Sequence, residues 1–177
     1  MVTAAAHACE PIDMTPATQV PGLAELYARH YEAVFRAALR VTGNPSDAED
    51  VLQTVFLRVL SHGDDAEQRD VAQRPAAYFC RAAVNASVDV LRRRTVHAET
   101  AYDDQAPHAS VDPALLLKEQ LRRAIAVLDR DDATLFLLRY VEGLSNQELA
   151  DLFVLEKNNV AVRLHRIRQR LQAEMER

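Results

Sequence analysis

Residues 142–172 constrain the fold most, because they carry the signals for two helices separated by a tight turn. Gly143 can adopt the left-handed backbone conformation that closes a preceding helix. Ser145 is then a helix N-cap, and Glu148 three residues later completes a capping box. Farther along, apolar residues at helical spacing form one stripe, namely Val160, Leu164, Ile167, Leu171 and Met175. The pattern predicts a helix-turn-helix whose second helix could enter a DNA major groove.

Composition and periodicity favour an all-α fold for the rest of the chain. Only 4 of the 177 residues are Gly and 49% are hydrophobic, which suits helices around a sizeable core. Asn44 and Asp112 each precede a proline, a pairing that marks the start of a helix. Helices are predicted over about residues 23–42, 45–62, 75–94, 113–128 and 132–142.

Apolar residues at three- and four-residue spacing define the inner face of the predicted helices. In the second helix this face is Ala48, Val51, Leu52, Val55, Phe56, Val59 and Leu60. In the third helix it is Tyr78, Phe79, Ala82, Ala83, Ala86 and Val90. In the helix after Pro113 it is Leu117, Leu121, Ala124, Ile125 and Leu128.

Three segments without helical periodicity divide the chain. Residues 1–22 are rich in Ala, Thr and Pro and predict a flexible tail, and the polar residues 61–74 predict a loop. Residues 95–114 contain four acidic residues and no Lys or Arg, which indicates an acidic flexible linker. The chain is therefore expected to form two small helical domains, residues 23–94 and 115–177.

Charge is unevenly distributed along the chain. The formal net charge is −5, which is unfavourable for a DNA-binding protein. However, residues 1–115 hold 10 basic and 16 acidic side chains, whereas residues 116–177 hold 11 and 10. Between Lys157 and Arg170 there are five basic side chains and no acidic one. This distribution suits a protein that touches DNA locally and another macromolecule elsewhere.

Secretion, membrane insertion and catalysis are not indicated. Cys9 and Cys80 are the only cysteines, and a free thiol is expected. No run approaches the ~18–20 apolar residues of a membrane span, and the N-terminus does not resemble a signal peptide, so a cytoplasmic location is expected. There is no Glu-x-x-His pair, zinc-type Cys/His cluster or glycine-rich phosphate loop. We expect no catalytic residues, no metal site and no cofactor, and solvated side chains for His30, His62, His97, His108 and His165.

Three segments, taken in order, resemble one family. ALRVTGNPSDAEDVLQTVFLRVL (38–60) contains a Gly-Asn turn and an Asp-Ala-Glu-Asp helix start. AAYFCRAAVNASVDVLRRR (76–94) has an aromatic residue, then an Asn, an Asp four residues later and an arginine cluster. AIAVLDRDDATLFLLRYVEGLSNQELAD (124–151) is similar to the first part of a promoter-reading domain. Over about residues 23–177, the chain resembles the bacterial RNA polymerase sigma factors of the extracytoplasmic-function (ECF), sigma-70-like family.

The resemblance implies that the helix over residues 45–62 docks on the clamp helices of the RNA polymerase β′ subunit. The outward candidates for this contact are Asp50, Gln53, Leu57 and Arg58. Asp50 and Arg58 could instead be ordinary solvated charges, but an exposed Leu57 beside polar residues favours a contact surface. The acidic linker would pass through the active-site cleft and RNA exit path of the polymerase, or would be an ordinary disordered linker.

The resemblance also implies that residues 61–74 and the following helix open the −10 promoter element and capture an unpaired base. A protein separates DNA strands without ATP if it binds the single-stranded form better. Asn85 would supply hydrogen bonds, and arginines would contact phosphates. The candidate set is Arg81, Asn85, Arg92, Arg93 and Arg94. For Asp89, an ion pair with Arg93 four residues later is expected.

The second helix of the C-terminal helix-turn-helix would, by the same resemblance, read the −35 element. Asn suits adenine, and Arg suits guanine or phosphate. The candidates are Lys157, Asn158, Asn159, Val162, Arg163 and Arg166. Arg168 and Arg170 are expected to be solvated. Phe153 stands where the family has a turn Gly, and Leu155 where it has an N-cap Ser, so the helix is expected to begin later, capped by Asn158.

The expected function is that of a non-enzymatic sigma factor that binds core RNA polymerase and directs initiation at specific promoters. Its implied partners are the β′ clamp helices and β flap of the polymerase, promoter DNA and an anti-sigma factor. A rival interpretation is a helical transcription adaptor that binds polymerase or a regulator without reading DNA. A response-regulator output domain is disfavoured, since the N-terminal half lacks the alternating strands of a receiver domain.

Overall fold

The structure is a computed structural model that describes residues 22–61, 71, 73–100 and 112–176. The described part contains seven long helices and no strands, which confirms the expected all-α fold. The helices are α1 (Leu23–Thr42), α2 (Pro45–Leu60), α4 (Pro75–Thr100), α5 (Pro113–Val127), α6 (Arg130–Tyr140), α7 (Asn146–Phe153) and α8 (Lys157–Met175). The tail and most of the 61–74 loop and of the linker lie outside the described residues, so their flexibility stays a prediction.

Side-chain caps set the starts of two helices, as the sequence predicts. Asn44 accepts a hydrogen bond from the Ser46 backbone N–H at 2.8 Å, ahead of α2. Asp112 accepts one from the Ala114 N–H at 2.9 Å, ahead of α5. These oxygens satisfy backbone donors that the first turn of a helix leaves free. At the other end of α1, Gly43 takes the left-handed conformation with a φ of 69°.

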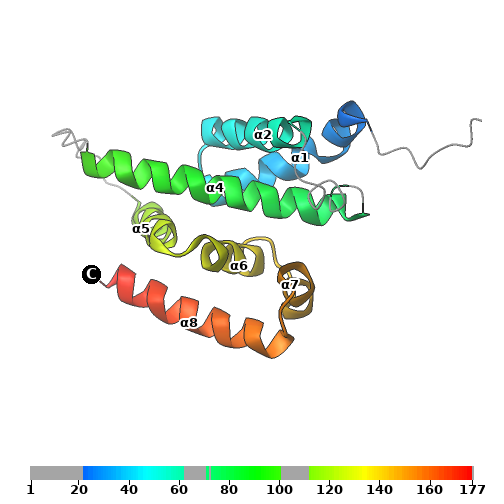
Figure 1. The fold of residues 1–177 in the computed structure, drawn as a ribbon. Helices are drawn as coiled ribbons and strands as arrows, with labels where there is room; N and C mark the ends of the chain where they lie inside the picture. The colour runs from blue at the N-terminus through cyan, green and yellow to red at the C-terminus, as the bar shows by residue number, and fades with distance from the viewer. Residues whose placement is uncertain (1–21, 62–70, 72, 101–111, 177) are drawn as a thin grey trace, which may run out of the picture.

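α4 is the central helix of the molecule (Figure 1). α1 and α2 pack against it on one side, and α5 and α6 pack against it on the other. α8 is an outer helix that packs on α5 and α6, and α7 connects α6 to α8. The two halves of the chain are therefore joined along α4.

Two apolar cores form on opposite sides of α4. The first is built from α1, α2 and α4, and its Phe79 is only 1% exposed. It also includes Val71, from the segment that the sequence predicts as a polar loop. The second core is built mainly from α5 to α8, but Val84, Val88 and Leu91 of α4 belong to it. α4 is thus apolar on two faces, and most of its polar residues lie between them, although Ser87 is fully buried and bonds to the Ala83 carbonyl.

Three details differ from the sequence-based expectation. Leu60 is 49% exposed because it is the last residue of α2, and Leu117 is 56% exposed in the N-terminal part of α5. Spacing alone assigns both residues to inner faces. α4 continues six residues beyond Arg94 to Thr100, since no Pro or Gly interrupts this stretch even though its apolar periodicity is lost.

Candidate nucleic-acid and protein interfaces

The outward face of α2 is open to solvent. Asp50, Gln53, Leu57 and Arg58 are all exposed, and Leu57 is 62% exposed. Leu60 lies one turn after Leu57, so two exposed leucines stand beside polar side chains on this helix. Helical spacing alone does not predict that Leu60 is exposed, because Leu60 adjoins the row of inner apolar residues of this helix. An apolar patch rimmed by polar residues is typical of a protein-binding surface.

The polar face of α4 is covered by the C-terminal half of the chain. The Thr134 hydroxyl on α6 donates a hydrogen bond to the side-chain oxygen of Asn85, at 2.5 Å. Arg81 donates to the Leu152 carbonyl of α7 at 3.5 Å. Both Arg81 and Asn85 are expected to contact −10 DNA, and both are half-buried here.

Arg92, a third residue expected at the −10 element, caps the C-terminal end of α5. Its guanidinium donates to the Leu128 carbonyl at 2.5 Å and to the Ala126 carbonyl at 3.3 Å. The last carbonyls of a helix lack partners within the helix, and the helix dipole also favours a cation there. Arg93 is the single residue of the five-residue −10 set that is exposed to solvent.

Asp89 pairs with a different arginine from the one expected. Its two carboxylate oxygens accept hydrogen bonds from Arg130, each at 2.5 Å, across the contact between α4 and α6. Arg130 is 41 positions away in the chain, so spacing along α4 cannot indicate it. The ion pair with Arg93 is therefore not the one that forms, and Asp89 instead ties α4 to the C-terminal half.

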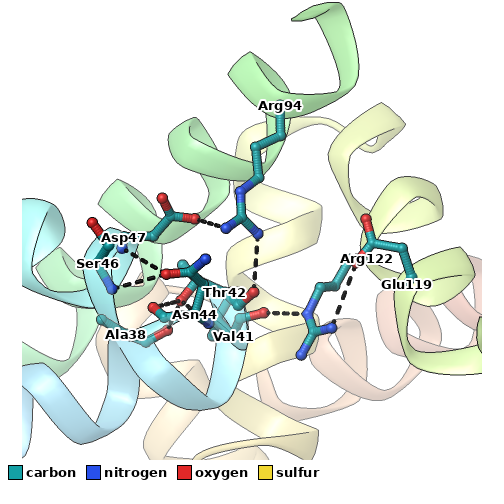
Figure 2. A network of polar contacts seen from close by, with 9 residues as sticks. All are labelled: Ala38, Val41, Thr42, Asn44, Ser46, Asp47, Arg94, Glu119 and Arg122. Atoms are coloured by element: carbon teal, nitrogen blue, oxygen red, sulfur yellow. Dashed lines mark hydrogen bonds and ion pairs between the residues drawn. The ribbon is translucent and has the colours of Figure 1, made fainter. Parts of the chain in front are cut away.

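Two arginines cap the C-terminal end of α1 (Figure 2). Arg94 of α4 donates to the Thr42 carbonyl at 3.2 Å and forms an ion pair with Asp47 of α2. Arg122 of α5 donates to the Val41 carbonyl at 3.0 Å. Arg94 thus joins α1, α2 and α4, which is a structural use of a residue expected to contact phosphates.

The start of α7 follows the predicted capping box. The Glu148 backbone N–H donates to the Ser145 hydroxyl at 3.2 Å, and the Ser145 N–H donates to the Glu148 carboxylate at 2.7 Å. This backbone hydrogen bond lowers the pKa of Glu148, because it stabilises the charged form. Gly143 precedes the box in the left-handed conformation, with a φ of 79°, as predicted.

The turn between α7 and α8 is centred on Val154, not on Phe153. Phe153 is the last residue of α7, and Val154 takes the left-handed conformation with a φ of 53°. Phe153 and Leu155 both pack against the second core, so the residue between them takes the bend. A β-branched residue is strained there by about 1–2 kcal/mol. α8 begins directly after its N-cap Glu156, so the expected cap at Asn158 is wrong.

The N-terminal part of α8 presents an open face. Its exposed residues include five of the six expected to contact DNA, Lys157, Asn158, Asn159, Val162 and Arg166. Val162 is 50% exposed, so the face combines amide, basic and apolar groups. In a helix-turn-helix, this end of the second helix contacts the edges of the bases. The arrangement is suited to major-groove contacts, where amides and guanidinium groups bind bases and apolar groups contact thymine methyls.

Arg163 and Arg170 clamp α8 onto α6. Arg163 donates to Asp132 at 2.6 Å, and its side chain is 33% exposed. Arg170 donates to the same Asp132 at 3.0 Å and to Asp129 at 3.4 Å. These contacts replace the outward position expected for Arg163, whereas Arg170 is 51% exposed, as expected, although it is ion-paired. The sequence signal that indicates them is the acidic run at the start of α6, namely Asp129, Asp131 and Asp132, which precedes the basic α8 in the chain.

Two titratable side chains are buried away from the candidate surfaces. The His30 ring stacks on Phe79, with centroids 4.8 Å apart, so the expected solvated state of His30 is wrong. Burial, and then the nearby Arg29 charge, lower the pKa of His30. Cys80 is a free, half-buried thiol whose pKa is raised to about 11, mainly by burial.

The described residues show neither a metal site nor a membrane span. No group of three or more His, Cys, Asp or Glu side chains among them is arranged to hold a metal ion. None of the described helices is both long enough and apolar enough to cross a bilayer.

Comparison with known proteins identifies both halves of the chain. Residues 26–96 match the model of Sigma-70 region 2, and residues 118–171 match that of Sigma-70, region 4. The RNA polymerase sigma-E factor of Streptomyces avermitilis is 30% identical over 158 residues, covering 86% of this chain and 84% of that protein. The RNA polymerase sigma factor CarQ of Myxococcus xanthus is 32% identical over 149 residues, covering 80% and 82%.

Two further similarities are more distant. The ECF RNA polymerase sigma factor SigW of Bacillus subtilis is 22% identical over 168 residues, covering 86% of this chain and 88% of that protein. A solved structure of the sigma factor RpoE in complex with the anti-sigma factor NepR, from Bartonella quintana, aligns with a TM-score of 0.45. That alignment has 17% identity and covers 85% of this chain and 94% of the other.

Proposed function

Because the chain belongs to the ECF group of sigma-70-like RNA polymerase sigma factors, we propose that α2, α4 and α8 each provide one of its binding surfaces for promoter recognition. The chain is an initiation factor that binds core RNA polymerase and directs transcription from specific promoters. The observation that carries the proposal is the exposure of the expected binding residues on two outer helices, α2 and α8 (Figure 1). The chain acts by binding and has no enzymatic step of its own.

α2 is the proposed docking surface for the β′ clamp helices. Leu57 and Leu60 supply the apolar contact, and Asp50, Gln53 and Arg58 form its polar rim. Burial of exposed apolar area drives such an association, while the charged rim sets its orientation and association rate. The C-terminal domain would make the second polymerase contact, with the β flap.

α8 is the proposed reader of −35 duplex DNA. Asn158, Asn159 and Arg166 can make paired hydrogen bonds to base edges, and Val162 can contact a thymine methyl. Lys157 adds a phosphate contact at the start of the helix. Arg163 has an indirect part in this proposal, since its ion pair with Asp132 fixes the angle of α8 on α6.

α4 is the proposed binding surface for the unpaired −10 strand. Asn85 would hydrogen-bond a base, and Arg81, Arg92 and Arg93 would contact phosphates. Preferential binding of the single strand is enough to open the duplex, with no nucleotide hydrolysis. Arg94 remains with α1 and α2 and positions the helix.

The remaining parts of the proposal concern residues 101–111, which the structure does not describe, and the partner proteins. The acidic segment around residues 101–111 would occupy the RNA path of the polymerase and be displaced as the transcript grows. An anti-sigma factor would act by covering the α2 and α8 faces. An intracellular site of action, with the polymerase, follows from these partners.

Transcription with purified core polymerase tests the proposal. We expect promoter-specific transcripts only when the chain is added. Leu57→Asp should weaken core binding by about tenfold or more, because it places a charge in the apolar contact. Ala28→Asp is the matched control, since Ala28 is an exposed apolar residue of α1 outside the docking surface, and it should bind core as the unmodified chain does.

The outcome also separates the two candidate functions. Core binding without promoter-specific transcripts would favour a helical adaptor, and no core binding at all would defeat the sigma assignment of these surfaces. For the −35 contact, Asn158→Ala with Asn159→Ala should weaken binding to promoter duplex by about tenfold. Arg168→Ala, an exposed residue farther along α8, is the control and should have little effect.

A further inference from the structure

We propose that Glu156, the residue directly before α8, selects a cytosine at one edge of the −35 element by accepting a hydrogen bond from its exocyclic amino group. The inference rests on the function proposed for α8. It adds an acidic side chain to the basic, amide and apolar groups expected to contact the bases, and it makes that side chain a determinant of promoter specificity.

The Glu156 carboxylate has no hydrogen-bonding task in the free protein. Glu156 is the N-cap residue of α8, yet its side chain makes no capping hydrogen bond. Only its backbone serves the helix, since the Val160 N–H donates to the Glu156 carbonyl at 3.1 Å. The side chain is exposed, and among the described residues it has no ion-pair partner. Ser145 differs, because its hydroxyl caps α7. The carboxylate of Glu156 is therefore available to a ligand.

The turn before α8 holds the backbone of Glu156 in a defined place. Leu155 packs against the second core, and its N–H donates to the Ala150 carbonyl at 2.8 Å. Val154, in the left-handed conformation, closes α7 and directs the chain into α8. Because the backbone on both sides of Glu156 is fixed, a contact by its side chain costs only the ordering of that side chain.

Glu156 extends the open face of α8 at the N-terminal end of the helix. Asn159 lies three residues after Glu156, and Val162 lies three residues after Asn159. This is the spacing of neighbours on one face of a helix, and all three side chains are exposed. In a helix-turn-helix, the first residues of the second helix contact the base edges. The carboxylate therefore lies at the edge of the surface proposed to read the −35 duplex.

A carboxylate on this surface can bind only a base that offers a hydrogen-bond donor. The donors in the major groove are the N4 amino group of cytosine and the N6 amino group of adenine. Adenine also presents N7, an acceptor that repels a carboxylate, whereas guanine presents two acceptors and thymine an acceptor and a methyl group. Phosphates repel the carboxylate as well. Glu156 therefore favours cytosine and disfavours the other contacts, which gives specificity by repulsion as well as by attraction.

The dipole of α8 also favours a carboxylate at the start of the helix, and a control must separate this role from base recognition. Asp131 is exposed in the first turn of α6, so its charge has an equivalent position at the start of a different helix. Asp131→Asn removes a charge from a helix start as Glu156→Gln does. Both variants should lose the same small dipole interaction, but only Glu156→Gln should change the choice of base.

Selection of DNA by the holoenzyme is the test. Holoenzyme is assembled from purified core polymerase and the full chain and is bound to a pool of long DNA duplexes of random sequence. Sequencing of the bound duplexes gives the base preference at each position. Gln makes paired hydrogen bonds with adenine, so Glu156→Gln should move the preference at one −35 position from cytosine to adenine. The ratio of cytosine to adenine there should fall by at least about fivefold, the lower end of discrimination by one side chain. Glu156→Ala should lose the cytosine preference without gaining one for adenine.

The expected change is confined to that one position, and Asp131→Asn should select the same sequences as the unmodified chain. Circular dichroism verifies that each variant is folded. A cytosine preference that is unchanged in both Glu156 variants, or a −35 motif of the unmodified chain that contains no cytosine preference, would overturn the role of Glu156 and leave the function proposed for α8 standing. If the unmodified holoenzyme selected no −35 motif at all, the function proposed for α8 would fail, and the role of Glu156 with it.

Discussion

The outward face of α2 and the polar face of α4 carry similar side chains but lie in different surroundings. Asp50, Gln53 and Arg58 of α2 are in solvent. Asn85, Asp89 and Arg92 of α4 are joined to α5 and α6 by hydrogen bonds and an ion pair. α2 has one apolar face, so its opposite side is open, whereas α4 has two apolar faces and its polar residues lie at the edge of the second.

The two surfaces therefore differ in what a partner must displace in order to bind. A partner can bind the exposed face of α2 without any rearrangement of the chain, so its affinity depends only on the contacts that it makes there. The polar residues of α4 already bind the C-terminal half, so any ligand that takes up these groups must replace those contacts.

Phe79→Ala should remove the support that α2 and α4 share. Phe79 is 1% exposed and its ring lies 5.1 Å from that of Phe56 on α2. Loss of a fully buried aromatic ring leaves a cavity, so the free energy of unfolding should fall by about 3–5 kcal/mol. Urea denaturation followed by circular dichroism measures it. Phe79→Leu is the control and should cost less, and an equal cost for the two variants would contradict a packing role.

Arg92→Ala and Arg93→Ala should differ although the residues are neighbours. Arg92 satisfies the Leu128 and Ala126 carbonyls, so its loss should lower the free energy of unfolding by about 1–3 kcal/mol. Arg93 is exposed, and its replacement should stay within about 0.5 kcal/mol. Thermal or urea unfolding of the pair checks this. Equal stabilities would mean that the polar face of α4 is not covered in solution.

The contrast between these two arginines shows what the sequence can and cannot predict. Helix starts at Asn44 and Ser145 are local, since each cap and its target lie within three residues, and they are predicted correctly. The partner of Asp89 is 41 positions away. The i,i+4 rule therefore favours Arg93, and only the packing of α4 against α6 brings Arg130 into reach.

For the candidate surfaces too, the sequence predicts the local features and misses the long-range ones. Exposure on α2 and α8 follows from helical spacing, because only one face of each helix is apolar. Helical spacing does not predict that the C-terminal half packs on α4. Val84, Val88 and Leu91 have no pattern in the sequence that indicates a second core, and only the fold places them in it. Spacing likewise assigns Arg163 to the outward face, and only its distance to Asp132 reveals its role.

Val154→Gly should raise the free energy of unfolding, and it tests the conformation of the turn that precedes α8. Val154 is 91% exposed and strained by its positive φ, while Gly takes this conformation readily. The free energy of unfolding should rise by about 1 kcal/mol. Val162→Gly is the control with the opposite sign, because Gly inside a helix costs about 1 kcal/mol. A loss of stability in Val154→Gly would show that the turn has another conformation.

Mild acid should destabilise the packing of α1 on α4, because it favours protonation of His30. Burial lowers the pKa of His30 in the folded protein below its ordinary value of 6.5. Below pH 6.5 the unfolded chain therefore takes up a proton that the folded protein refuses, and protonation favours unfolding. The stabilising contribution is fully present above pH 6.5 and is lost as the pH falls toward the folded pKa. His30 stacks on Phe79, so the weakened side is the packing of α1 on α4, beneath the α2 surface.

His30→Phe isolates this effect, because it keeps a ring in the aromatic stack and removes the titration. Urea unfolding at pH 7.5 and at 5.5 should show a larger fall in stability for the unmodified chain than for the variant, with a difference on the order of 1 kcal/mol or less. His165→Phe, at an exposed site on α8, serves as the control and should keep the pH response of the unmodified chain. If His30→Phe and the unmodified chain lost equal stability on acidification, the buried imidazole would have no part in it.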